Sequence, residues 1–174
     1  AGVLSVKKVG QFWEDIFWVR KLQGTVLHSQ DAWLLIRGMR TLFLRVEKSC
    51  RNAMAIAKHF EGHKHIETVL YPGLPSDPGH KIAKRQTGGQ FGGMMSLIVM
   101  GTEQNAIDVT RFCELFYPAT SLGGVESLIE HRKTVSGEGF PVHPGLLRLS
   151  IGIEDADDLI YDIEQSLSRA FGGT

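Results

Sequence analysis

The sequence has few cysteines and no long apolar stretch. Its 174 residues include only two cysteines, Cys50 and Cys113, far apart in the chain. Such a pair does not form a disulfide framework, so we expect both thiols to be reduced, as in a cytoplasmic protein. No apolar run approaches the roughly 20 residues that cross a bilayer, and the first residues do not resemble a secretory signal. We therefore expect a cytoplasmic protein without a membrane span.

An excess of charge of either sign is also absent. Lys plus Arg and Asp plus Glu both number 19, so the formal net charge is zero. Binding to nucleic acid or to an anionic membrane needs a clustered positive field, which this balance does not favour. Near-zero net charge favours association, so a homo-oligomer is expected.

What the chain does have is enough apolar sequence for a substantial core. Hydrophobic residues make up 43% and charged residues 22%, values typical of a globular domain. Apolar spacing and turn residues predict alternating helices and strands. The expected helices are residues 11–22, a segment capped by Asp31 that pauses near Gly38, 44–60, a short helix ending near 86, 103–112 and 156–170. The expected strands are 1–6, 66–71, 91–100, 115–117 and 146–153, with a polar loop over 132–145.

This irregular order of elements predicts an α+β fold with a mostly antiparallel sheet and helices packed on one face. The length corresponds to one domain with a small appendage.

Five motifs carry a resemblance to a known family. They are DAWLLIRGMRTL at 31–42, YPGLPS at 71–76, FGGM at 91–94, SLGGVESLIEH at 121–131 and LRLSIGIED at 147–155. Their sequence and order resemble those of the Cys/Met-metabolism enzymes that use pyridoxal phosphate (PLP), the cystathionine γ-synthase and γ-lyase type.

The resemblance implies a fold, a division of the chain and a cofactor. The expected fold is the family's C-terminal small domain, a roughly four-stranded antiparallel sheet with helices on one face. Residues 1–28 are expected to be a remnant of the PLP-binding large domain with a connecting helix, and 29–174 the small domain. The family's cofactor lysine lies in an S-x-T-K segment upstream of the strand that matches residues 1–4. We therefore expect no catalytic or cofactor-binding residue in this chain, no bound PLP and no activity for the chain alone.

Arg148 is the first candidate for substrate binding. A guanidinium grips a carboxylate with two parallel hydrogen bonds, and a charged side chain within an apolar strand is costly without a purpose. From the residues alone, a water-facing arginine on an edge strand is the simpler interpretation. The resemblance instead implies that Arg148 clamps the substrate carboxylate.

Thr120, Ser121 and Leu122, which stand just before the glycine pair Gly123-Gly124, are the other candidates. The glycine pair Gly123-Gly124 permits unusual backbone angles before what we expect to be a helix-like segment from Val125. An ordinary loop is the alternative to a ligand-binding turn. The resemblance implies that Ser121 and Leu122 line the active site. Thr120 stands where many relatives have Glu, and it lacks the charge that would pair with a distal amino group, which puts cystathionine specificity in doubt.

The seven histidines form no metal-binding signature, so no metal site is expected. The resemblance implies an amino-acid substrate and γ- or β-elimination or replacement at carbon–sulfur bonds in the complete enzyme. It does not separate lyase, synthase and sulfhydrylase. The alternative is a non-catalytic, stand-alone domain that binds a partner subunit or a small amino acid.

Overall fold

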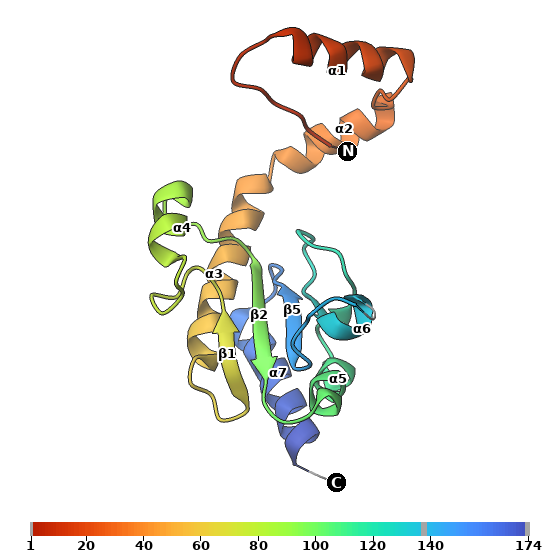
Figure 1. Cartoon of the computed structure of the whole chain (residues 1–174). Coiled ribbons are helices and arrows are strands. Elements are labelled where there is room, and N and C mark those ends of the chain that lie inside the picture. Colours follow the sequence, from red (N-terminus) through yellow and green to blue (C-terminus); the bar gives the residue numbers. More distant parts are fainter. Residues whose placement is uncertain (1, 137–138, 173–174) are drawn as a thin grey trace. The chain divides into compact units, whose positions relative to one another are not determined.

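The computed structural model describes residues 2–136 and 139–172. The chain divides into two units, Ala1–Phe43 and Leu44–Thr174, each with its own internal contacts. Figure 1 shows the elements in order along the chain.

The N-terminal unit contains two helices, α1 (Gln11–Leu22) and α2 (Ser29–Met39). Helix α1 has the predicted bounds. Helix α2 begins two residues before Asp31, and His28 caps it by accepting the Gln30 amide on Nδ1, so the predicted cap was wrong. Residues 2–6 form no strand, because an isolated extended segment has no partner for its backbone groups. Within residues 2–43, no side chain is buried.

The second unit holds the sheet and most of the helices. Helix α3 (Leu42–Phe60) begins at the end of the first unit and carries the predicted apolar face. The elements that follow are β1 (Ile66–Leu70), α4 (His80–Thr87), β2 (Met94–Val99), α5 (Glu103–Phe112), β3 (Tyr117–Pro118), β4 (Leu128–His131), α6 (Arg132–Ser136), β5 (Leu146–Ser150) and α7 (Ala156–Phe171).

The α+β class is confirmed, but the sheet has five strands and is mixed. Its order is β1-β2-β5-β4-β3. The first four strands in that order pair antiparallel, as predicted for a four-stranded sheet. The two-residue strand β3 adds a parallel edge, since the Tyr117 amide donates to the Ser127 carbonyl and the Ala119 amide to the Ile129 carbonyl. The expectation of four strands was therefore incomplete.

One face of the sheet builds the core. Alternate residues of β2 and β5 are fully or almost fully buried: Met95, Leu97, Val99, Leu147 and Leu149. They belong to one apolar cluster with Ile56 of α3, Val109 of α5 and Ile163 of α7. Figure 1 shows α3 and α7 on the same side of the strands. The intervening residues lie on the opposite face, where Ser96 and Arg148 stand between the apolar side chains of Met94 and Ile98.

The region predicted as a polar loop, 132–145, contains the short helix α6 at its start. Its polar composition concealed the helix, which is too short to show apolar periodicity. Residues 137–138 of that predicted loop lie outside the described residues.

Candidate functional site

Arg148 lies in the middle of the sheet on the face opposite the core. Its strand, β5, is flanked by β2 and β4, so the interpretation as an edge-strand arginine was wrong. Its side chain is 23% exposed. Ser96 of β2 and Glu130 of β4 are its direct neighbours across the sheet. Ser96, Arg148 and Glu130 therefore form a polar row across the sheet, and the other face of the sheet is apolar.

Two acceptors hold one nitrogen of the Arg148 guanidinium. Nη1 donates to the backbone carbonyl oxygen of Thr120 at 2.7 Å and to Oε1 of Glu130 at 3.2 Å. Among residues 2–136 and 139–172, neither Nε nor Nη2 has a hydrogen-bond partner. Nε and Nη2 form one of the parallel-donor edges with which a guanidinium grips a carboxylate. Because both contacts use Nη1, the edge formed by Nε and Nη2 remains complete for a ligand.

Glu130 is buried between two arginines. Its side chain is 4% exposed, and Oε1 also accepts a hydrogen bond from Arg132 Nη1 at 3.0 Å. Its other oxygen, Oε2, has no hydrogen-bond partner within the described part of the chain. One carboxylate between two guanidiniums leaves a net charge of about +1, which favours an anionic ligand. Sequence reasoning missed Glu130, because His131, Arg132 and Lys133 follow it and the local pattern gives no sign that it is buried.

The loop before β4 forms hydrogen bonds with the end of β5 and with the residues that follow it. The Gly123 amide donates to Ser150 Oγ at 3.2 Å, and the Ile153 amide to the Val125 carbonyl at 2.9 Å. The approach is close at Gly152, where an added Cβ would lie 2.2 Å from the Val125 carbonyl oxygen. The helix-like segment expected from Val125 is absent, and strand β4 begins at Leu128 instead.

The loop brings one predicted site residue to Arg148. Thr120 contributes its backbone carbonyl rather than its side chain, so the contact itself does not depend on the residue type at that position. Ser121 and Leu122 are exposed, and neither forms a described contact with Arg148. Their predicted role in lining an active site stays a prediction.

A small pocket of about 250 Å³ adjoins the contacts of Arg148 and shares Thr120 and Glu130 with them. Its polar lining includes Glu130 and the threonines Thr110, Thr120 and Thr134, and Ile107 and Val135 add apolar surface. No lysine lines it within the described residues. A Schiff base to PLP requires a lysine amine, which the described lining of this pocket does not supply.

His59 of α3 and His63, three residues beyond its end, contact the same carboxylate. His59 Nε2 lies 2.7 Å from Glu164 Oε1, and His63 Nε2 lies 3.4 Å from Oε2. In the part of the chain that the structure describes, no group of three or more metal-ligating side chains is arranged to hold an ion. Over the same residues, no helix is long and apolar enough to cross a membrane.

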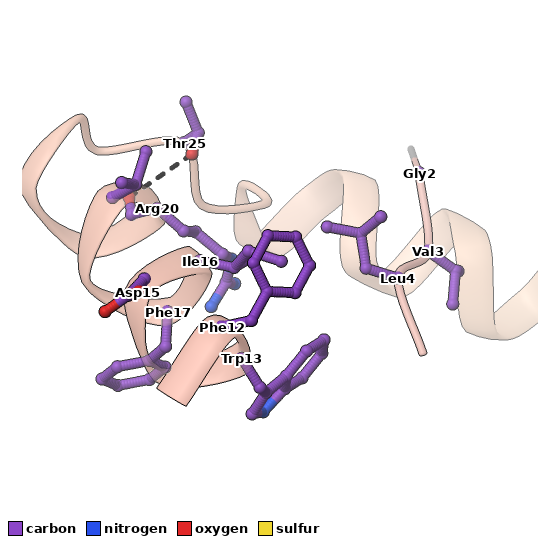
Figure 2. Close-up of a pocket in the computed structure, with 11 residues that line it drawn as sticks. Gly2, Val3, Leu4, Phe12, Trp13, Asp15, Ile16, Phe17, Arg20 and Thr25 are labelled. Atoms are coloured by element: carbon purple, nitrogen blue, oxygen red, sulfur yellow. Dashed lines mark hydrogen bonds between the residues drawn. The ribbon is translucent and has the colours of Figure 1, made fainter. Parts of the chain in front are cut away.

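A larger hollow belongs to the N-terminal unit. It measures about 870 Å³ and is lined mainly by apolar side chains, among them Leu4, Phe12, Trp13, Ile16 and Phe17. Figure 2 shows Phe12, Trp13, Ile16 and Phe17 on α1 and Leu4 on the separate N-terminal segment. Asp15 and Arg20 are its charged lining residues, and none of the predicted site residues contributes to it.

Comparison with known proteins identifies the fold. Cystathionine gamma-synthase from Mycobacterium bovis is 43% identical over 159 residues, covering 88% of this chain and 41% of that protein. Cystathionine gamma-lyase from Bacillus subtilis is 41% identical over 176 residues, covering 97% of this chain and 46% of that protein. The crystal structure of cystathionine gamma synthase from Xanthomonas oryzae pv. oryzae in complex with aminoacrylate and cysteine is 40% identical. It superposes with a TM-score of 0.85, covering 91% of this chain and 43% of that chain.

The fold is therefore that of a portion of a PLP-dependent enzyme. The family model for Cys/Met metabolism PLP-dependent enzymes matches residues 1–168. The chain belongs to this family, as its motifs predicted. It spans less than half the length of the curated relatives it matches.

Proposed function

We propose that this chain is the substrate-carboxylate-binding domain of a PLP-dependent trans-sulfuration enzyme. The complete enzyme would eliminate or replace groups at the carbon–sulfur bonds of amino acids. The family match and the names of the relatives support this class of reaction. The observation that carries the proposal is the Arg148 guanidinium, held by Nη1 with its Nε and Nη2 edge open.

The division of labour follows from the residues present. Arg148 would bind and orient the α-carboxylate of the substrate, and Thr120 would fix the height of the guanidinium above the sheet through its carbonyl. Ser121 and Leu122 would form an exposed wall beside the bound amino acid. PLP supplies the electron sink for this chemistry, and we assign its binding to the part of the enzyme outside this chain. The chain alone is expected to carry no PLP.

The test is Arg148→Lys in the complete enzyme. Lysine keeps the positive charge but loses the planar, two-pronged fit to a carboxylate. A charge-assisted contact of this kind contributes about 1.5–3 kcal/mol, so kcat/KM should fall about ten- to a hundredfold. PLP absorbance and melting temperature should not change. Steady-state kinetics, absorbance and thermal unfolding are measured on the same preparations.

Arg111→Lys is the matched control, because Arg111 is a surface arginine that pairs with Asp108 on its own helix. That substitution should leave kcat/KM unchanged. Unaltered kinetics in Arg148→Lys would reject the carboxylate clamp. A lower melting temperature with a proportional loss of PLP would indicate a folding role for Arg148 instead.

A further inference from the structure

Glu130 differs from the carboxylate of an ordinary surface ion pair in its burial and in its contacts. It lies on β4 directly opposite Arg148, and its side chain is almost completely enclosed. A carboxylate loses much hydration on burial, and it is retained only where hydrogen bonds offset that loss. Here all the observed hydrogen bonds reach Oε1, whereas Oε2 is buried without a partner in the described residues. This is an expensive arrangement for stability alone.

The geometry suggests what the arrangement achieves. Arginine has a long side chain with many rotamers, and an unrestrained guanidinium also turns about its own axis. The Thr120 carbonyl and Glu130 Oε1 engage the same nitrogen, Nη1, from a loop and from a neighbouring strand. Two acceptors on one nitrogen determine both the position and the rotation of the planar group. They leave Nε and Nη2 together as the edge that faces away from the contacts.

We propose that Glu130 is a positioning residue that fixes the rotation of the Arg148 guanidinium, so that its Nε and Nη2 edge is presented to a ligand carboxylate. This proposal rests on the proposed function and deepens it. Glu130 does not touch the ligand, and it acts only through Arg148. Preorganisation of this kind improves binding because the ordering cost is met before the ligand arrives.

The negative charge of Glu130 has an effect that opposes this improvement in binding. A carboxylate beside an anion site repels the incoming anion, which would weaken binding. Arg132 reduces this repulsion because its Nη1 shares the same Glu130 oxygen at 3.0 Å. The site as a whole therefore keeps a net positive charge while one arginine is fixed. The positioning effect is expected to dominate.

The experiment uses the 174-residue chain with arginine side chains labelled with ¹⁵N. In the unliganded protein, a fixed guanidinium gives separate Nη1 and Nη2 signals for Arg148, whereas a freely rotating group gives one averaged signal. Sodium propionate is then titrated, and propionamide serves as the neutral ligand of the same shape. Glu130→Ala removes both the charge and the acceptor, and Glu130→Gln keeps one acceptor oxygen. Glu103→Gln is the matched control, since this exposed carboxylate pairs with Lys133 away from Arg148.

The expected result has two parts. Wild type and Glu103→Gln should show separate Nη signals, whereas Glu130→Ala should show an averaged one. The dissociation constant for propionate should rise about tenfold in Glu130→Ala and about threefold in Glu130→Gln, as expected for loss of a preorganised contact. Propionamide should not bind in any variant.

The outcomes separate this proposal from the function on which it rests. Separate Nη signals and unchanged propionate affinity in Glu130→Ala would overturn the positioning role, even if Arg148→Lys abolishes binding. A wild-type protein whose Arg148 signals do not respond to propionate would argue against the carboxylate clamp. In that case, the rotation of the unliganded guanidinium still decides whether Glu130 fixes Arg148. A lowered melting temperature with unchanged Nη signals would make Glu130 a purely structural residue.

Discussion

At the scale of single residues, strand alternation explains why Arg148 was predictable and its partner was not. Arg148 interrupts an apolar strand, whereas Glu130 begins a polar run, and both lie on the face of the sheet opposite the core. Of these two residues, the resemblance drew attention only to Arg148. Pairing between β4 and β5 is a non-local property, and only the observed register places the two charges opposite each other. The Thr120 contact was also hidden, because it uses the backbone.

The environment of Cys113 gives a prediction about chemical reactivity. Burial raises the pKa of its thiol to about 12, and the nearby carboxylate of Asp162 also raises the pKa, while a hydrogen bond from Ser166 lowers it. The thiolate is the reactive form. In a Cys50→Ser variant, Cys113 should therefore react with iodoacetamide at pH 8 at least about a hundredfold more slowly in the native protein than in urea.

Mass spectrometry of timed samples measures both rates. The Cys113→Ser variant, in which Cys50 is the remaining thiol, serves as the comparison. Equal rates for Cys113 in native and unfolded protein would contradict the prediction, because they would mean that folding neither buries the thiol nor raises its pKa.

At the scale of elements, the carboxylate of Asp162 on α7 accepts hydrogen bonds from the segment between α5 and β3. Asp162 is 2% exposed. Its Oδ1 accepts a hydrogen bond from the Glu114 amide at 2.8 Å, and its Oδ2 accepts from the Leu115 and Phe116 amides at 2.9 and 3.1 Å. These amides lie beyond the last turn of α5 and have no strand partner. A side chain of α7 thereby supplies hydrogen-bond acceptors for the backbone amides that precede the edge strand β3.

Asp162→Asn should destabilise the protein by about 2–4 kcal/mol. Asparagine offers one acceptor oxygen and turns a donor toward amides that also donate, which leaves buried polar groups unsatisfied. Urea unfolding monitored by circular dichroism measures the change in free energy of unfolding. Asp158→Asn, at an exposed position in the first turn of the same helix, should cost no more than about 1 kcal/mol. Similar values for the two variants would count against the anchoring role.

Most elements were predictable where local patterns are strong. Helix α5 has the predicted bounds because Thr102 and Asn105 form a capping box, and α7 follows the N-cap Asp155. The errors occurred where the decisive contact is distant or the element is short. Strand β3 has two residues, and α6 has five. The parallel pairing of β3 depends on amides and carbonyls ten residues apart, which no local pattern records.

At the scale of the whole molecule, the exposed apolar side chains of the first unit predict association. Phe12, Phe17 and Trp18 of α1 are 75%, 46% and 50% exposed, and Trp33 of α2 is 60% exposed. Several large apolar side chains this exposed favour contact between molecules. Residues 2–6 form no strand, so the two helices provide these exposed apolar side chains.

The chain should therefore self-associate at high concentration. Sedimentation equilibrium should show a mass above 19.3 kDa, and Phe12→Gln combined with Trp18→Gln should shift the equilibrium toward monomer. Phe140→Gln, which replaces an exposed aromatic side chain of the second unit, is the control and should have little effect. A clean monomer for the unaltered chain at every concentration would contradict this prediction.

The position of β5 has a consequence for biosynthesis. This strand occupies the middle of the sheet, yet it is the last strand to be made. While a ribosome is still translating the segment before residue 146, β1 and β2 can form a hairpin, but β2 and β4 each have an unpaired edge toward the gap. Open edges of this kind are templates for mispairing between nascent chains. Arrival of β5 fills the gap, joins the two halves of the sheet and brings Arg148 beside Glu130 in the same event, so the guanidinium of Arg148 is held in place only when the sheet is complete.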